Sequence, residues 1–460
     1  MNPVAVVGGG ITGLTAAFRL RARGIPMMLY EAGGHVGGVI RSIRENGYLA
    51  EFGPNSILET SPKIGELVKD LGLTSRQMHS DPAAENRYIV RAARPVKLPG
   101  SPLAFLGTPL FGWGAKLRLM IEPLIPRAPA DREESLEHFV LRRIGREFLD
   151  YAINPFVAGV YAGDPARLSV QQAFPKLAEI EQRYGSLILG QILGARERKR
   201  RAEVSKADAK KLSFDEGLQV LTDALGKSVG DSWVLNAAVH SLARSGPGWR
   251  IRWRDGAREK SAEHSAVLLS TPAFKLAELT IEGATLAPLA KIHYPPVASV
   301  VLGFRRSDVA HPLDGFGMLI PAVEKCRILG SLFSSSLFPN RAPAGHVLIT
   351  SYVGGVRSPE LATRDEAELI SMTLGDLRRI LGVTGEPTFK HTVLYPRAIP
   401  QYEVGYGAFR DQMTSFERQA PGIFLAGHYR NGISLGDSLL AGLAVTERIA
   451  THVTPSIPQS

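Results

Sequence analysis

Four glycines lie where the first apolar run of the chain gives way to an amphipathic segment. Glycine has no side chain, so a backbone built this way can approach a phosphate group closely. The segment that follows has helical spacing, and the N-terminus of such a helix offers free N–H groups and about half a positive charge to an anion. The spacing Gly-x-Gly-x-x-Gly therefore predicts a dinucleotide-binding turn. Its members are Gly8, Gly9, Gly10, Ile11, Thr12 and Gly13.

The flanking residues supply the elements that this turn needs. Val4–Val7 form a continuous apolar run, which is typical of a buried parallel strand. Leu14–Arg23 have helical spacing, and a second predicted strand, Met27–Tyr30, ends at Glu31. An acid at that position is expected to bind a ribose hydroxyl. A glycine-rich turn in an unrelated α/β fold is the alternative, and it leaves Glu31 as a coincidence.

A second glycine pair favours FAD over NAD. It lies in GGVIRS, where Gly37 and Gly38 let the backbone meet the same dinucleotide again. Arg41 of this motif can neutralise the pyrophosphate or contact the flavin end. NAD sites do not usually need this second approach. The pattern resembles that of the FAD-dependent amine-oxidase and phytoene-desaturase superfamily.

A further strand–glycine–helix unit is predicted near the C-terminus. Ile423–Ala426 form an apolar run, Gly427 and Gly432 open the turn, and Leu439–Ile449 have helical spacing. In flavin folds the last helix directs its N-terminus toward the flavin ring and its ribityl chain. A terminal strand and helix that merely complete the sheet are the alternative for this segment alone. The three glycine segments together predict FAD as the cofactor.

The composition is that of a globular protein with several domains. The 460 residues are 44% hydrophobic and 21% charged, and this length predicts two or three domains. Lys and Arg number 54 against 44 Asp and Glu, and the net charge of +10 favours anionic partners. Nucleic acid is not expected, because no binding motif accompanies the charge. The single cysteine, Cys326, can form neither an internal disulfide nor a metal cage, so we expect a reducing, cytoplasmic location and no metal.

The middle of the chain is predicted to leave the nucleotide domain and return to it. Trp233–Leu242 and Arg252–Leu269 contain strand-like stretches, and the second ends in LLSTP before a helix. From about Ile292 alternation dominates in VASVVLGF, GFGMLIP, RILGSLF and HVLITSYVGG, which predicts an antiparallel sheet. Glu366–Leu381 have the spacing of one long helix.

The predicted fold class is α/β, with an FAD-binding Rossmann-like domain interrupted by a β-rich substrate domain and a mainly helical, membrane-associated insertion. The FAD-binding domain is expected to take residues 1–80, 211–290 and 411–460. The substrate domain is expected to take residues 81–98 and 291–410, and the insertion residues 99–210.

A family resemblance runs nearly end to end. Its matching blocks are GGGITGL, GGVIRS, EFGPNSIL, DPAAENRYIV, GVYAGDPARLSV, FGMLIP, ILGSLF, SYVGG, IPQYEVGYG and the C-terminal glycine unit. The chain resembles the oxygen-dependent protoporphyrinogen oxidases of haem biosynthesis. The glycine motifs are shared by the whole superfamily, whereas GVYAGDP with LSV and IPQY are far more particular. One departure is Leu435–Ser438, where family members often carry Asn-Asp-Cys, and it weakens the flavin contacts expected there.

The resemblance implies both the reaction and the residues around it. Three two-electron rounds would convert a porphyrinogen into the planar porphyrin, with non-covalent FAD taking the hydride and molecular oxygen forming hydrogen peroxide. No catalytic acid or base is nominated, because the flavin carries the difficult step. Flavin contacts carried over from the family are Gly38, Val39, Ile40, Arg41, Val239, Leu394, Ile433, Ser434 and Leu435. Substrate contacts carried over are Asn55, Gly159, Phe316, Gly317, Leu319, Tyr352 and Ile399. Without the resemblance, the apolar residues among them would be assigned to the core.

Protoporphyrinogen IX is the expected substrate, and coproporphyrinogen III is the alternative. The two differ at two ring positions, and burying each extra propionate of the second against apolar walls is costly unless a cation meets it. The carried-over apolar pocket includes no basic residue. Some relatives carry a propionate-binding arginine where this chain has Asn55. Arg91, Arg94 and Lys97 could bind propionates instead, although a solvated basic turn explains them equally well.

Pro99–Pro126 predict a patch that dips into an anionic membrane surface. Apolar side chains among glycines and prolines, followed by basic side chains that meet lipid phosphates, suit such a patch. Its members are Leu103, Phe105, Leu106, Leu110, Phe111, Trp113, Lys116 and Arg118. A hydrophobic hairpin that covers the substrate cavity is the equal alternative. No apolar run approaches the roughly 20 residues that span a bilayer, so we expect peripheral attachment at the inner face of the cell membrane. The charge run Ala195–Lys211 is expected to be solvated.

Two other classes of function compete with a porphyrinogen oxidase. An amine oxidase or carotenoid desaturase of the same superfamily predicts an amine-binding aromatic pair or a long apolar tunnel, and it leaves GVYAGDP and IPQY unexplained. A lipid-chaperoning protein that shares the fold without flavin would be colourless when purified. The sequence leaves the oligomeric state open, and a homodimer is one option.

Overall fold

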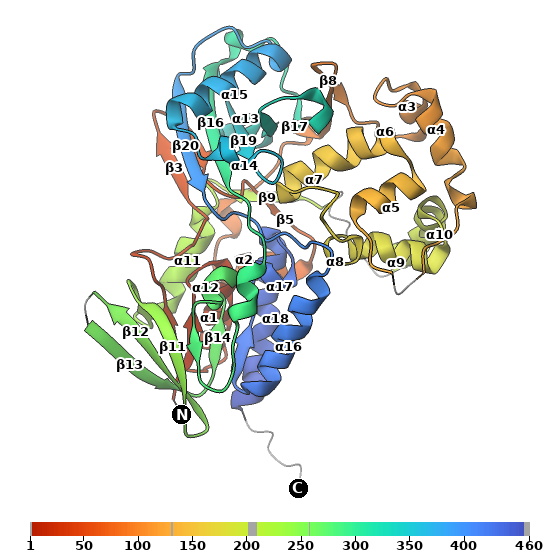
Figure 1. The fold of residues 1–460 in the computed structure, drawn as a ribbon. Helices are drawn as coiled ribbons and strands as arrows, with labels where there is room; N and C mark the ends of the chain where they lie inside the picture. The colour runs from red at the N-terminus through yellow and green to blue at the C-terminus, as the bar shows by residue number, and fades with distance from the viewer. Residues whose placement is uncertain (1, 130–131, 201–208, 257, 455–460) are drawn as a thin grey trace.

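A parallel sheet of five strands forms the centre of the lower domain in Figure 1. The computed structural model describes residues 2–129, 132–200, 209–256 and 258–454. The strand order is β10-β2-β1-β14-β21, and all the pairings are parallel. The strands are β1 (Val4–Val7), β2 (Met27–Tyr30), β10 (Trp233–Val234), β14 (Val267–Leu269) and β21 (Ile423–Leu425). The predicted Rossmann-like sheet is therefore confirmed, with strands drawn from distant parts of the chain.

Long helices pack around this sheet. They are α1 (Ile11–Ala22), α11 (Gln219–Val229), α16 (Tyr406–Gln419) and α18 (Leu435–Val453), and α1 contacts both α11 and α18. Shorter helices of the same domain are α2 (Pro62–Asp70), α12 (Ala273–Leu276) and α17 (His428–Asn431). The boundary expected after residue 410 falls inside α16, which contacts β21.

The last helix begins earlier than its apolar spacing suggests. Spacing alone predicted a start at Leu439, whereas α18 begins at Leu435. The Ser434 side chain accepts a hydrogen bond from the Asp437 backbone, and the Asp437 carboxylate accepts one from the Ser434 backbone. This reciprocal cap satisfies two N–H groups that a helix start otherwise leaves unpaired.

Three smaller sheets complete the flavin side of the molecule. One has the order β13-β12-β11-β15, and its Trp249 is fully buried and donates to the Pro421 carbonyl at 3.0 Å. A hairpin pairs β3 with β4, and a third sheet has the order β5-β9-β6. The strands are β11 (Ala238–Ser245), β12 (Gly248–Asp255), β13 (Arg258–His264), β15 (Thr280–Ile281), β3 (Ser42–Glu45), β4 (Tyr48–Glu51), β5 (Ile57–Leu58), β9 (Lys211–Phe214) and β6 (Gln77–His79).

A sheet of seven strands forms the upper part of the molecule in Figure 1, with order β20-β16-β19-β18-β17-β7-β8. The strands are β20 (Phe389–Tyr395), β16 (Val297–Arg305), β19 (His346–Gly354), β18 (Ile328–Leu332), β17 (Gly315–Leu319), β7 (Asn86–Arg91) and β8 (Arg94–Lys97). The predicted antiparallel sheet is confirmed except where β17 meets β7, since that pair is parallel. The predicted helix is α15 (Glu366–Leu381), which packs against one face, with α13 (Ser334–Leu337) and α14 (Pro359–Ala362) nearby.

The remaining part is a group of helices on the right of Figure 1. They are α3 (Pro102–Gly107), α4 (Trp113–Met120), α5 (Leu136–Arg143), α6 (Arg146–Phe148), α7 (Asn154–Tyr161), α8 (Val170–Ala173), α9 (Pro175–Tyr184) and α10 (Leu187–Arg200). Residues 201–208 of the expected charge run lie outside the described residues. No helix in the described ranges is long and apolar enough to cross a membrane.

Several residues assigned to the membrane patch lie inside this group instead. Leu110 is 0% exposed, and the Phe111 ring stacks on Phe148 with centroids 4.4 Å apart. Phe105 joins the same cluster, and the Lys116 ammonium is buried against the carbonyls of Leu106 and Thr108. Apolar composition marks the segment as hydrophobic without saying which side chains turn inward. The assignment of Leu110, Phe111 and Lys116 to lipid is therefore wrong.

A buried ion pair joins the two sheet domains. Arg341 lies 3.2 Å from the Glu51 carboxylate at the end of β4, and each side chain is about 2% exposed. Glu51 also accepts hydrogen bonds from the Ser42 hydroxyl and the Leu218 backbone, while Arg341 donates to the Ser213 hydroxyl at 2.6 Å. Burial raises the pKa of the Glu51 carboxyl, and the Arg341 charge opposes that rise.

Replacing Arg341 by Met should strongly destabilise the protein. The substitution keeps the length of the side chain but leaves the Glu51 carboxylate buried without its cation, which costs about 3–5 kcal/mol of unfolding free energy. Urea denaturation measures this loss. The control is Arg378→Met, which removes an ion pair to Glu386 on the surface and should cost about 1 kcal/mol or less. Equal losses in the two variants would contradict the role of the buried pair.

Candidate functional site

The turn after β1 can form only with glycine at two of its positions. Gly8 has φ +108°, a conformation that other residues rarely adopt. A Cβ on Gly13 would lie 2.0 Å from the Gly8 carbonyl oxygen, so a side chain there would push α1 off β1. These glycines therefore serve the packing of helix on strand.

Gly10 is bare for a different reason. A Cβ built on it meets no protein atom within 4 Å, and it caps α1 with no side-chain hydrogen bond to the first turn. The N–H groups of that turn, from Ile11 to Gly13, are therefore left for another acceptor. Gly38, with φ +62°, stands across from it, and its Cβ would lie 3.4 Å from the Gly10 Cα. The two glycine motifs meet as the sequence suggests for a pyrophosphate cradle.

The Glu31 carboxylate lies at the carboxyl end of β2 and is held by backbone. It accepts hydrogen bonds from the N–H groups of Gly9 and Gly33, each at 2.7 Å. The chain entering β11 lies beside it, because the Ala237 N–H donates to the Glu31 carbonyl at 2.8 Å. Val239, two residues further on, is half-buried next to this turn. Glu31 is thus positioned for a ribose, with Val239 close by.

The C-terminal glycine unit has backbone groups, more than side chains, available for a ligand. The Ser434 hydroxyl caps α18, and the Thr12 hydroxyl donates to the Ser438 carbonyl at 3.0 Å. Both hydroxyls are therefore engaged within the protein, while Ile433 and Leu435 are half-buried. The departure from the family at Leu435–Ser438 leaves a well-capped helix start, whose N–H groups remain able to meet an electron-rich ligand.

The predicted flavin contacts differ in how far their side chains are exposed and in which way they point. Val39 is 56% exposed, whereas Ile40 is buried in the core under α1. Leu394 pairs with Ala298, whose side chain packs under α15, so the Leu394 side chain turns to that face. Its neighbour Tyr395 turns the other way. The flavin contact at Leu394 stays a prediction, and it is the Tyr395 hydroxyl that lies near the segment 53–55, 3.5 Å from a Cβ built on Gly53.

These features fit FAD. Two bare backbone segments meet at Gly10 and Gly38, an acid ends β2, and two helices begin beside them without a side chain covering the first turn of α1. When bound, FAD would be held by the N–H groups of residues 10–13, by Glu31 and by the start of α18. The described residues contain no group of three or more His, Cys, Asp or Glu that could hold a metal.

The open face of the seven-stranded sheet gathers the predicted substrate residues. Leu319, Gly330 and Tyr352 lie in one row across β17, β18 and β19, on the face opposite α15. Gly330 has no side chain, and a Cβ built on it would lie 3.4 Å from the Leu319 side chain. Gly317 has φ +152°, and its Cβ would lie 2.2 Å from the Ser331 carbonyl oxygen, so only glycine fits there.

Helix α7 faces this sheet and adds residues that sequence reasoning missed. A Cβ on Gly159 would lie 2.4 Å from the Leu319 side chain, so the helix and the sheet touch at this point. Phe156 and Val160 stand three residues before and one after Gly159, and both are more than 40% exposed. Exposed apolar side chains at this helical spacing line an open wall. Ile399 is half-buried, and Ala398 beside it packs with Tyr352.

Asn55 and Tyr352 meet across the junction of the two domains. The Asn55 amide nitrogen lies 2.8 Å from the Tyr352 hydroxyl and 3.3 Å from the Gly53 carbonyl. A Cβ on Gly53 would in turn lie 2.4 Å from the Val39 carbonyl oxygen. The segment 53–55 therefore connects the loop of residues 37–41, called here the flavin loop, to the substrate face.

The cations expected to bind propionates are engaged elsewhere. Arg91 pairs with Glu147 at 2.7 Å, and Lys97 with Asp314 at 3.2 Å, while Arg94 lies in the same exposed β7–β8 hairpin. Lys97 lies opposite Tyr88 and so faces the α15 side of the sheet, whereas Arg91 shares the face of Arg87 but is held by Glu147. The interpretation of Arg91 and Lys97 as propionate ligands stays a prediction, and both cations already have a carboxylate partner.

Two other cations stand at the edge of that face. Arg87 lies opposite Gly317 in the β7–β17 pairing. The Lys211 ammonium lies 5.5 Å from the centre of the Phe316 ring, and no hydrogen bond or ion pair within the described ranges engages it. Burial, and then the Arg87 charge, lower the pKa of Lys211. A half-buried ammonium of this kind is a ready partner for a carboxylate.

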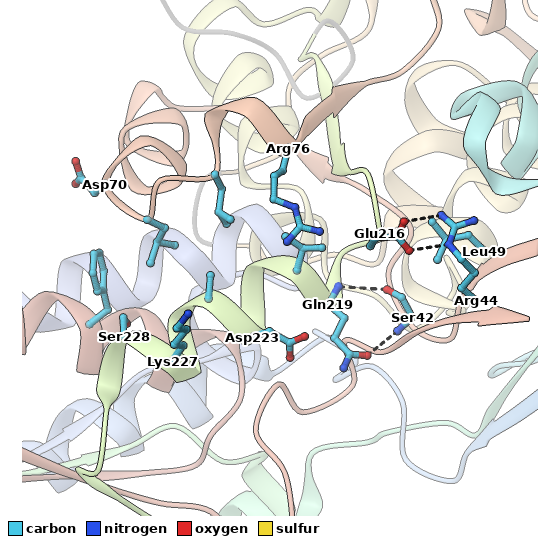
Figure 2. A pocket seen from close by; sticks show the side chains of 15 residues that line it. Ser42, Arg44, Leu49, Asp70, Arg76, Glu216, Gln219, Asp223, Lys227 and Ser228 are labelled. Carbon is cyan, nitrogen blue, oxygen red and sulfur yellow. Dashed lines mark hydrogen bonds and ion pairs between the residues drawn. The ribbon is translucent and has the colours of Figure 1, made fainter.

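A hollow of about 730 Å³ lies apart from this site, between α1, α11, the end of α2 and the β3–β4 hairpin (Figure 2). Arg44 and Glu216 form an ion pair at its rim, with atoms 2.7 Å apart, and the Ser42 backbone donates to Gln219. None of the described residues predicted to bind cofactor or substrate lines it. Size alone therefore does not identify the reaction site.

Comparison with known proteins agrees with this geometry. A family model described as flavin containing amine oxidoreductase matches residues 11–450. The chain belongs to this family. It is 34% identical to protoporphyrinogen oxidase 2 of Arabidopsis thaliana over 98% of this chain and 94% of that protein. It is 27% identical to the coproporphyrinogen III oxidase of Bacillus subtilis over 98% of each chain. The resemblance stated from the motifs is confirmed.

Proteins of known structure share this fold even where their sequences differ widely from this chain. A structure from Exiguobacterium sp. superimposes with a TM-score of 0.82 at 24% identity, covering 97% of this chain and 98% of that one. UDP-galactopyranose mutase superimposes with a TM-score of 0.74 at 16% identity, covering 99% and 97%. Since the fold accommodates different substrates, the substrate must be argued from the site.

Gly10→Val should produce folded protein that lacks flavin. Its Cβ meets no protein atom, so any loss of cofactor comes from blocking the approach of the pyrophosphate. The flavin-to-protein ratio, measured by absorbance after purification, should fall at least about tenfold, since one lost charge-assisted contact set is worth over 1.4 kcal/mol. The control is Gly65→Ala in α2, where a Cβ also meets open space. A flavin-replete Gly10→Val protein would count against the cradle.

Proposed function

We propose that the protein oxidises protoporphyrinogen IX to protoporphyrin IX with molecular oxygen, releasing hydrogen peroxide, through non-covalently bound FAD. The observation that carries this proposal is the contact between the flavin loop and an apolar, open sheet face through residues 53–55. Names of the relatives add support, since both protoporphyrinogen and coproporphyrinogen oxidases match along nearly the whole chain. Non-covalent binding is supported by Cys326, which lies in the cluster under α15 on the far face of the sheet.

The chain's own part in the reaction is placement. Bound FAD would supply the acceptor for hydride from a bridging carbon of the macrocycle. Leu319 on the sheet, with Phe156 and Val160 on α7, would enclose the macrocycle and exclude water. Burial raises the pKa of the Tyr352 phenol far above its usual range, so this group stays protonated and serves as a hydrogen-bonding group rather than a base. The protein must therefore orient the macrocycle and provide an apolar wall that excludes water.

The distribution of charge favours protoporphyrinogen. Its propionates lie on neighbouring rings, so they project from one edge of the macrocycle. The Lys211 ammonium lies at one edge of the open face, and Leu319 and Phe156 form apolar walls. Coproporphyrinogen carries propionates around the ring and would press carboxylates against those walls. An unmatched buried carboxylate is costly, whereas the net charge of +10 acts mainly on the encounter rate.

Protoporphyrinogen IX should be turned over with a kcat/KM about tenfold or more above that for coproporphyrinogen III, because one unmatched carboxylate costs more than the roughly 1.4 kcal/mol of a tenfold step. Porphyrin fluorescence under one buffer condition measures both. A ratio favouring coproporphyrinogen would overturn the substrate while leaving the flavin chemistry. Turnover of neither porphyrinogen by flavin-loaded protein would overturn the function itself, and an amine or carotenoid substrate would then be tested.

We also propose that the helical group rests on an anionic lipid surface, through residues other than the buried ones. Leu103 is 82% exposed and Leu124 is 83% exposed, and Trp113, Leu117 and Met120 of α4 are more than half exposed. α10 lies at the same end of the molecule (Figure 1) and exposes Ile192 and Leu193. Exposed large apolar side chains gathered in this way mark an interaction surface, and the positive net charge favours anionic lipid.

Replacing Trp113, Leu117 and Met120 together by Ser should release the protein from vesicles of mixed neutral and anionic phospholipid. Each side chain removed takes about 1.5–3 kcal/mol of apolar burial from the lipid contact, so the bound fraction in a flotation assay should drop at least about tenfold. Activity in detergent should be retained. The control is the pair Val323→Ser and Val404→Ser, which are exposed but lie elsewhere. If the triple variant floats like wild type, the patch is not the lipid contact.

A further inference from the structure

The Asn55 amide has a hydrogen-bonding pattern that leaves one atom unused. Its nitrogen donates to the Tyr352 hydroxyl at 2.8 Å and to the Gly53 carbonyl at 3.3 Å. A primary amide nitrogen carries two hydrogens, so both are engaged. The amide oxygen accepts no hydrogen bond from the described residues. Asn55 is only half-buried, so this oxygen can meet a ligand on the open face.

The two acceptors fix which way the amide points. The Gly53 carbonyl can only accept, so an inverted amide would set two oxygens against each other. The Tyr352 hydroxyl, held on the sheet in the row with Gly330 and Leu319, supplies the second and shorter contact. Because burial keeps this phenol protonated, it accepts from Asn55 and retains its own hydrogen for a further bond. Tyr352 and Gly53 thus hold the amide nitrogen and leave the amide oxygen without a partner among the described residues.

We propose that Tyr352 is a positioning residue that orients Asn55 to accept a hydrogen bond from a ring N–H of the bound tetrapyrrole. This inference rests on the proposed function. A porphyrinogen carries an N–H donor on each pyrrole, and an apolar cavity leaves a buried donor unpaired at a cost of about 1–3 kcal/mol. A neutral amide oxygen meets such a donor without adding a charge beside the carboxylate-binding edge. The ligand class recognised here is therefore a macrocycle with free ring N–H groups.

Tyr352→Phe removes the hydroxyl and keeps the aromatic wall. We expect the KM for protoporphyrinogen IX to rise about three- to tenfold, the loss of one neutral hydrogen bond, with kcat changed less than about twofold. Asn55→Leu should raise KM by a similar factor, and the double variant should match Asn55→Leu, because both changes remove the same contact. The control is Tyr48→Phe, which loses a buried hydroxyl contact to Thr388 at 2.6 Å and should leave KM unchanged.

A second measurement separates N–H recognition from general packing. Free-base protoporphyrin IX and its four-coordinate nickel(II) complex have the same outline, but the complex has no ring N–H. As competitive inhibitors, the free base should bind wild type about three- to tenfold more tightly, and Tyr352→Phe should remove most of that preference. A merely structural role for Tyr352 would weaken both ligands equally.

The outcomes distinguish this inference from the function on which it rests. Wild-type protein that oxidises neither porphyrinogen overturns the proposed function. Active wild type, with a Tyr352→Phe variant that keeps both its KM and its preference for the free base, overturns the role of Tyr352. If Tyr352→Phe loses flavin or fails to fold, Asn55→Leu decides, and an unchanged KM and inhibitor preference in that variant would equally overturn the inference.

Discussion

The buried ion pair between Glu51 and Arg341 holds the two sheet domains in one relative position. Glu51 ends β4 on the flavin side, and the residues directly after it, 53–55, cross to the open face of the seven-stranded sheet. A charge buried without its partner is strongly unfavourable, so the pair excludes arrangements in which the domains separate. The distance between the flavin loop and the substrate wall is set by this short, doubly anchored segment.

On the two sides of that segment, the predicted cofactor site is formed by backbone groups and the predicted substrate site by apolar side chains. On the flavin side, Gly10 and Gly38 approach each other closely, and the hydroxyls of Thr12 and Ser434 make hydrogen bonds within the protein. On the other side, Gly159 lets α7 pack against Leu319 of the sheet, beside the predicted substrate residues. Such a site needs little acid–base chemistry of its own, because the cofactor carries the redox step.

The sequence predicted best what local spacing determines. The glycine turn, the parallel strands and α15 follow from patterns within a few residues, and each was found where expected. Side-chain direction was harder. Leu110 and Phe111 are apolar whether they face lipid or Phe148. Leu394 and Tyr395 lie on opposite faces of the sheet, and the face of each is set by pairing with β16, which the sequence of β20 alone does not show. The bond from Asn55 to Tyr352 spans 297 residues, and no pattern along the chain signals it.

The central claim is that electrons pass from a porphyrinogen on the sheet face to flavin held by the glycine cradle. Anaerobic mixing of FAD-loaded protein with protoporphyrinogen IX tests it most directly, because oxygen cannot then restore the oxidised flavin. The account predicts that the absorbance of oxidised flavin is lost on mixing, and that it returns, together with porphyrin fluorescence, when air is admitted. Flavin that stays oxidised in the presence of excess porphyrinogen would contradict the account.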